Sequence, residues 1–163
     1  MVRKRKSPAG GSGGDILLDG QDLVLQSRST LSSTRESIGE AAEKCMKVAA
    51  EQGCGEEAIT DIGIALREAL ANAITHGNDS DPKKRVQLLF YRDREGGVLL
   101  AVQDEGKGFD PDSIPDPTGG ERIHMSHGRG IFLMRELMDH VEHRKGGREV
   151  LLYKKCGAKK KHR

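Results

Sequence analysis

Glu68, Asn72 and His76 stand four residues apart in the stretch EALANAITHGN, and their side chains could do chemistry. Residues four apart in an α-helix differ by only about 40° around its axis, so these three would form one polar stripe. Apolar residues fill most of the remaining circumference, which indicates a packed helix. A polar stripe inside a packed helix needs partners, and three kinds fit: a hydrogen-bond network in the core, a metal ion or a ligand.

Glu68 and Asn72 would suit chemistry at a magnesium ion. The amide oxygen of Asn72 is a hard ligand for Mg²⁺, and Glu68, one turn earlier, could orient or deprotonate an attacking hydroxyl or water. The spacing also arises by chance, and the pair would then belong to a helix surface or a satisfied core network. For His76 we favour a capping role, because a positive charge is stabilising near the C-terminal end of a helix.

The segment VQDEGKGFDP places a carboxylate where an apolar strand gives way to glycines. Asp104 would lie at the floor of a pocket, and Gly106 and Gly108 would let the backbone approach a ligand closely. A carboxylate acceptor of this kind suits the exocyclic amine of adenine. The alternative is a plain turn that contains aspartate and glycine.

In the segment HGRGIFLMRELMD, glycines directly precede a predicted helix. Backbone N–H groups at Gly128, Arg129 and Gly130, together with the positive end of the helix dipole, could hold phosphate oxygens without side chains. The segment does not match the Walker pattern, which requires a lysine after its second glycine.

Helices and strands must position these segments, and their predicted order is segregated. Residues 1–14 are a basic leader without a pattern that could pack, and the loop over residues 106–130 is too long for an ordinary connection. The other predicted elements are a strand or hairpin around Asp19–Gly20, helices over 32–52 (capped by Ser32 or Ser33, with Glu36 in a capping box) and 56–75, strands over 85–94 and 97–106, a helix over 131–140, and a hairpin around Gly146–Gly147. This order predicts an α/β (α+β) two-layer sandwich.

Composition excludes several classes of protein. The chain has 163 residues and a formal net charge of +2, with the basic residues concentrated at its two ends, which we interpret as solvated tails. Aromatic residues make up 3 %, too few for a platform on which nucleic-acid bases stack. His124, His127, His140 and His143 lack ligand-like spacing with the cysteines, and most of them are expected at the surface or in loops.

The cysteines indicate a reducing compartment. Cys45, Cys54 and Cys156 are an odd number without a C-x-x-C pair, so we expect free thiols rather than a disulfide framework or a zinc site. The chain also has no apolar run long enough to span a bilayer and no signal-peptide pattern. These features predict a cytoplasmic protein.

Taken together and in order, the three segments resemble the N, G1 and G2 boxes of the histidine-kinase-like (GHKL, Bergerat-fold) ATPases. Within that superfamily, REALANAITHGN and GRGIFLMRELMD resemble the anti-sigma-factor serine/threonine kinases of the RsbW type. The resemblance covers residues 15–155 as one ATPase domain and leaves 1–14 and 156–163 as basic tails. It implies a mixed, mostly antiparallel sheet with helices on one face.

The resemblance implies roles for the residues of the first two boxes. Asn72 would hold Mg²⁺ against the triphosphate of ATP, and Asp104 would accept a hydrogen bond from the adenine amine. Gly106 and Gly108 would let the loop pass over the base. Glu68 would be the general base toward a serine hydroxyl of a STAS-domain anti-sigma factor antagonist.

The third box would contact the phosphates through Gly128, Arg129, Gly130 and Ile131, and the loop from Asp110 to His127 matches the ATP lid, which would shield the transfer from water. The resemblance further implies a homodimer and a sigma factor as a second partner, without direct contact to nucleic acid or membrane.

Two departures from the family pattern stand out. Many relatives have a threonine in the last hairpin that helps bind adenine through water, where this chain has Arg148, Glu149 and Val150. The arginine that relatives use to contact a sigma factor is not recognisable on the first helix, since Arg35 lies too far toward the N-terminus. A nucleotide-dependent module that sequesters a regulator without phosphotransfer is therefore the alternative, and nucleic-acid binding through the tails is a third.

Overall fold

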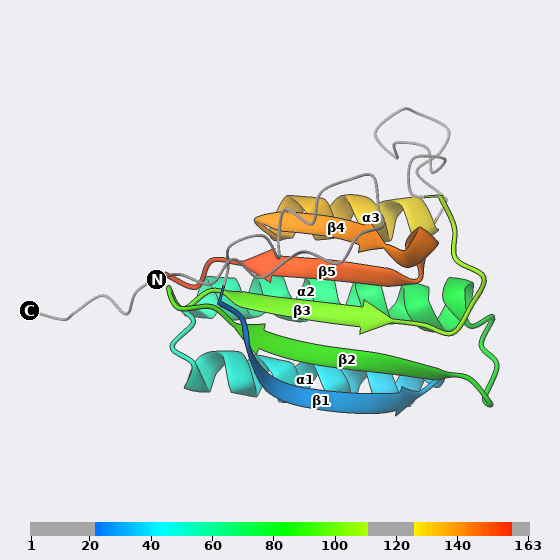
Figure 1. Ribbon diagram of the computed structural model, residues 1–163, viewed down its shortest axis with the longest axis horizontal. Coiled ribbons are helices and arrows are strands. Elements are labelled where there is room, and N and C mark those ends of the chain that lie inside the picture. The colour runs from blue at the N-terminus through cyan, green and yellow to red at the C-terminus, as the bar shows by residue number, and fades with distance from the viewer. Residues whose placement is uncertain (1–21, 111–125, 158–163) are drawn as a thin grey trace, which may run out of the picture.

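Three helices cover one face of an antiparallel sheet in the computed structural model, which describes residues 22–110 and 126–157 (Figure 1). The elements of these two ranges are β1 Val24–Ser32, α1 Arg35–Glu51, α2 Glu56–Asn72, β2 Arg85–Arg92, β3 Val98–Gln103, α3 Ser126–Leu137, β4 His140–Arg144 and β5 Glu149–Lys154. The predicted two-layer α/β sandwich is confirmed.

The sheet is five-stranded over the described residues, with the strand order β1-β2-β3-β5-β4. Each of its pairings is antiparallel, so the expected mixed sheet is antiparallel throughout this part of the chain. The two predicted hairpins, β2 with β3 and β4 with β5, are both present. Strand β5 lies between β3 and β4, which brings the last hairpin beside the centre of the sheet.

The main core fills the space between helices and sheet. Alternate residues of β3, namely Val98, Leu100 and Val102, point into it and are at most 1 % exposed. The buried faces of α1 and α2 are rich in alanine, which allows these helices to approach the sheet closely. A second buried cluster is formed by the alternate residues of β3 and β5 that point to the other face of the sheet: Leu99, Ala101, Leu151 and Tyr153.

The predicted capping box at the start of α1 is wrong. The helix begins at Arg35 after Thr34, and no side chain caps it. Ser33 is 5 % exposed and its hydroxyl donates instead to the carbonyl of Lys84, 2.9 Å away. A tertiary bond has therefore taken the hydroxyl that the local pattern assigned to the helix end.

Helix α2 also ends differently from the prediction. It stops at Asn72 rather than Thr75 and continues as a π-helical segment, Ala73–Gly77, in which the Asn78 N–H bonds the carbonyl of Ala73 at 2.8 Å. The wider winding breaks the expected four-residue stripe, because a π turn no longer stacks position 76 over position 72. His76 is accordingly exposed.

Helix α3 begins five residues earlier than expected, at Ser126 instead of Ile131. Met134 and Met138 pack in the core, 1 % and 5 % exposed. Gly128–Gly130 thus lie inside the first turns of the helix rather than in a loop before it.

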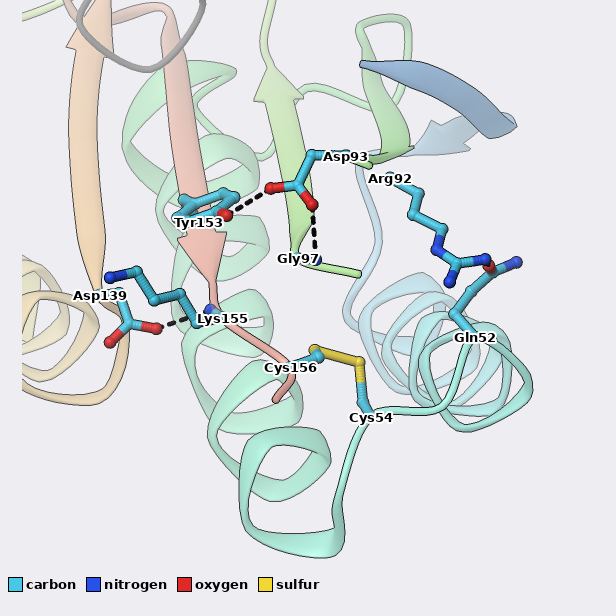
Figure 2. The surroundings of a disulfide bond; sticks show 9 residues. All are labelled: Gln52, Cys54, Arg92, Asp93, Gly97, Asp139, Tyr153, Lys155 and Cys156. Atoms are coloured by element: carbon cyan, nitrogen blue, oxygen red, sulfur yellow. Dashed lines mark hydrogen bonds between the residues drawn. A yellow bond between two sulfur atoms is a disulfide. The ribbon is translucent and has the colours of Figure 1, made fainter. Parts of the chain in front are cut away.

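The expectation of free thiols is wrong for two of the three cysteines. Cys54, between α1 and α2, forms a disulfide with Cys156, just after β5, and their Cα atoms are 4.5 Å apart (Figure 2). Cys45 remains a free, buried thiol. The two bonded residues are separated by 102 positions, so motif spacing carries no signal of their proximity.

Several predictions concern residues outside the described ranges. The basic leader, most of the Asp19–Gly20 strand or hairpin, residues 111–125 of the expected lid with His124, and the end of the basic tail fall there. None of the helices in the described ranges is long and apolar enough to cross a membrane.

Candidate functional site

Helices α2 and α3 bring two of the three sequence segments into contact. Glu68 and Asn72, both partly exposed on α2, lie beside Gly130 of α3. A Cβ atom at Gly130 would stand 2.9 Å from Glu68 Oε2 and 3.2 Å from Asn72 Nδ2. The glycine therefore leaves the space that the carboxylate and the amide occupy.

The remaining segment, VQDEGKGFDP, contacts the end of α2 through Asp104, which directly follows β3. The Asp104 N–H donates to the carbonyl of Arg148 at 2.9 Å, and the Gly106 N–H donates to Asp104 Oδ1 at 2.8 Å. The Asp104 carboxylate touches the space where a Cβ of Gly77 would be, and a Cβ of Gly106 would collide with the Gly77 carbonyl. Both glycines are needed for this close approach.

Burial changes the acidity of Asp104, which is 8 % exposed. Desolvation raises the pKa of its carboxyl above the ordinary value of 3.8, and the Gly106 N–H and the charges of Arg148 and Lys84 oppose the rise. A buried carboxylate with one backbone donor still has acceptor capacity for a ligand.

Asn72 and Asp104 share the wall of one pocket, with about 310 Å³ of empty space that includes its open mouth. Apolar residues from all the surrounding elements complete the wall: Ala69, Ala73, Val102, Phe109, Met134 and Val150. Apolar walls with a carboxylate at one side have the chemistry to bind a flat heterocycle that carries an amine.

His143 and Phe109 also line this pocket, and no sequence motif assigned them to it. Arg148, which stands in the region where many relatives have a threonine, lines the pocket as well. The ring of Phe109 meets that of His143 edge to face, with centroids 5.6 Å apart. Most of the histidines were expected at the surface or in loops, but His143 is half-buried in β4 opposite Val150. Strand alternation with Val141 could have placed it on the helix side, but only once the pairing was known.

Gly108 directly precedes Phe109 of the pocket wall and lies against the turn between β4 and β5. Its φ of 80° is a left-handed conformation that favours glycine, and the next residue, Phe109, donates its N–H to the Gly146 carbonyl at 2.8 Å. The position of Gly108 thus fixes where Phe109 enters the pocket wall.

The remaining predicted residues are not part of the pocket wall. Glu68 stands beside Asn72 at Gly130, and Ile131 is 3 % exposed in the main core. The N–H groups in the first turn of an α-helix have no partner within the helix. Since α3 starts at Ser126, the Gly128 N–H belongs to this turn, whereas the N–H groups of Arg129 and Gly130 can bond to carbonyls of the helix.

The residues present fit a magnesium ion held mainly by a nucleotide. No group of three or more His, Cys, Asp or Glu side chains suited to a metal occurs within 22–110 and 126–157. Asn72 offers one amide oxygen next to the Glu68 carboxylate, beside a glycine that keeps the space open. Mg²⁺ commonly takes only one or two protein oxygens and completes its shell with phosphates and water.

Comparison with known proteins agrees with this arrangement. Residues 31–154 match the family model of the histidine kinase-like ATPase domain. The serine-protein kinase RsbW of Listeria monocytogenes is 33 % identical over 103 residues, which are 58 % of this chain and 64 % of that protein. The RsbW of Halalkalibacterium halodurans is 29 % identical over 128 residues, 75 % of this chain and 77 % of that one.

A crystal structure of the RsbU and RsbW domains of a Mycobacterium tuberculosis protein shares the fold. It superposes with a TM-score of 0.56 at 20 % identity and covers 80 % of this chain and 32 % of its own. The chain therefore belongs to the family of histidine kinase-like ATPase domains, as its three sequence segments predicted.

Proposed function

We propose that the protein is an ATP- and Mg²⁺-dependent serine/threonine protein kinase that acts as an anti-sigma factor and phosphorylates a STAS-domain antagonist. The observation that carries the proposal is the contact of Glu68 and Asn72 at Gly130, next to a pocket that Asp104 lines. A protein that only senses ATP needs the Asn72 ligand but not a base beside it. Relatives named as serine-protein kinases support the same activity.

Each residue would have a separate task. The pocket would hold adenine, with Asp104 accepting from its amine and apolar walls excluding water. Asn72 would hold the magnesium ion, which when bound neutralises phosphate charge and orients the terminal phosphoryl group. Glu68 would take the proton of a serine hydroxyl on the partner protein as the hydroxyl oxygen bonds to the γ-phosphorus and ADP leaves. Its partial exposure on α2 would let a protein substrate reach it.

Phosphotransfer from labelled ATP to a candidate STAS protein tests the proposal. We expect Glu68→Ala to lower the transfer rate at least a hundredfold, the range that general-base catalysis supplies, with ATP affinity nearly unchanged. Glu57→Ala is the matched control, because Glu57 is exposed in the first turn of the same helix and far along it from Asn72.

Two results would contradict the proposal. Full transfer by Glu68→Ala would remove this carboxylate from the mechanism. If ATP changes the affinity for the partner while ATP and the partner both remain chemically unmodified, the binding-module alternative would be supported instead. The lid, the homodimer and a sigma factor as second partner stay predictions. The cytoplasmic location also stays a prediction, and the Cys54–Cys156 disulfide removes its argument from free thiols.

A further inference from the structure

Asn78 is the most buried polar side chain among the described residues, with 0 % exposure. It follows the π-helical segment Ala73–Gly77 at the end of α2 and is the last residue of the stretch EALANAITHGN, where its residue type and spacing assigned it no role. A buried amide that lacked partners would cost stability, so its contacts show what it does.

The side chain of Asn78 bonds three separate segments. Nδ2 donates to Ser33 Oγ and to the carbonyl of Arg85, each at 3.0 Å, and Oδ1 accepts the N–H of Glu105 at 2.8 Å. One amide thus connects the end of α2 to the β1–α1 junction, to the start of β2 and to the loop after β3.

The bond to Glu105 acts directly on its neighbour Asp104. The Glu105 N–H belongs to the peptide plane that follows Asp104, and the N–H of Asp104 itself, in the preceding plane, is held by the Arg148 carbonyl at 2.9 Å. With both flanking planes held, the backbone dihedrals of Asp104 are fixed, and the bond from the Gly106 N–H to Oδ1 then sets the direction of its carboxylate.

We propose that Asn78 is the positioning residue for Asp104: by holding the Glu105 N–H it aims the carboxylate into the pocket and sets the preference of the site for an amino-purine. This inference rests on the proposed function, in which Asp104 accepts from the adenine amine. Without the amide oxygen of Asn78, one of the two planes around Asp104 is released, and the carboxylate loses its fixed direction while the rest of the pocket remains.

The test compares ATP with inosine triphosphate, which carries a carbonyl oxygen in place of the 6-amino group. Calorimetry on the full chain, below the melting temperature of each variant, measures both affinities. We expect Asn78→Ala to lower the affinity for ATP about tenfold, which corresponds to the loss of one well-aligned hydrogen bond. The affinity for inosine triphosphate should fall less than about threefold, so the preference for ATP is lost.

Ser33→Ala is the matched control. It removes one buried bond of Asn78 and lowers stability, yet it leaves the bond to Glu105, so the preference for ATP should remain. If Asn78→Ala does not fold, Asn78→Ser replaces it, because its shorter hydroxyl cannot reach the Glu105 N–H but keeps a polar group at the site.

The outcomes separate this inference from the proposed function. Folded Asn78 variants that keep the wild-type ratio of the two affinities would overturn the inference, as would a wild-type protein that binds ATP and inosine triphosphate equally. Loss of the ratio in the Asn78 variants, with Ser33→Ala unchanged, would support it even if no phosphotransfer were found.

Discussion

Asp104 combines the ligand-binding role proposed for it with a cost to the stability of the fold. Its carboxylate is buried, and because desolvation dominates, its pKa lies above the ordinary aspartate value. The native state therefore holds a proton more tightly than the unfolded state does, and the ionised form opposes folding. A residue kept at such a cost is a candidate for function.

Asp104→Asn should stabilise the protein without nucleotide and lower its affinity for ATP. The amide keeps an oxygen for the Gly106 N–H but never ionises, and we expect at least a tenfold loss of ATP affinity from the missing charged acceptor. The gain in melting temperature over wild type should be absent below pH 3.8 and grow as pH rises through the raised native pKa. Melts over a pH series check the sign, and a gain that does not depend on pH would contradict it.

Motifs indicated those candidate site residues that can be recognised from their neighbours in the sequence. Glu68 and Asn72 follow from helical spacing, and Asp104 from the change of a strand into glycines. Asn78 and His143 did not follow, because Asn78 bonds partners 45 and 27 positions away and His143 enters the pocket only through the pairing of β4 with β5. Such residues carry no local pattern.

The crossing of α2 and α3 shows how helices set the geometry of the site. Glycine is a poor helix former, yet Gly130 lies inside α3 at the point of contact with Glu68 and Asn72. The end of α2 also depends on tertiary contacts, since its π-helical segment closes on Asn78, whose side chain is held by three other segments. Propensity alone predicted an uninterrupted helix to Thr75.

Gly130→Ala should separate stability from activity. The added Cβ would stand 2.9 Å from Glu68 Oε2, so the carboxylate and the Asn72 amide must shift, while alanine itself favours the helix by up to about 1 kcal/mol. We expect a melting temperature close to that of the wild type and phosphotransfer lowered at least tenfold, because small misplacements of reacting groups are costly.

Gly39→Ala on α1 is the control for that substitution, since an added Cβ there would meet nothing within 4 Å. It should raise the melting temperature slightly and leave transfer unchanged. Normal transfer by Gly130→Ala would mean that the contact with Glu68 and Asn72 does not set their catalytic geometry.

The two-layer fold followed from the segregated order of elements, but its long-range connections did not. Each hairpin was predictable because its strands are adjacent in sequence, whereas the insertion of β5 between β3 and β4 depends on the pairing of β3 with β5. The same layers are joined by Lys154, whose Nζ lies 2.9 Å from Asp61 Oδ2 of α2 and donates to the carbonyl of Leu137 in α3 at 2.7 Å. The disulfide between Cys54 and Cys156 lies at the same end of α2 (Figure 2).

The Cys54–Cys156 disulfide should contribute a large part of the stability. It spans 102 positions, and closing a loop of that length in the unfolded chain corresponds to about 4 to 5 kcal/mol in the entropic account. For a chain of this size, we expect reduction, or Cys156→Ser, to lower the melting temperature by roughly 10 to 15 °C.

Melts with and without dithiothreitol, with free thiols counted by alkylation and mass spectrometry, measure the effect of the disulfide. Cys156→Ser should no longer respond to the reductant, whereas Cys45→Ser should respond as the wild type does. Cys45 is a suitable control because its thiol is free and buried, and burial raises its pKa to about 11, which disfavours thiol exchange. A fully reduced wild-type protein with the same melting temperature as the oxidised protein would contradict this prediction. It would mean that Lys154 and the core already hold the two segments together and that the disulfide adds no net stability.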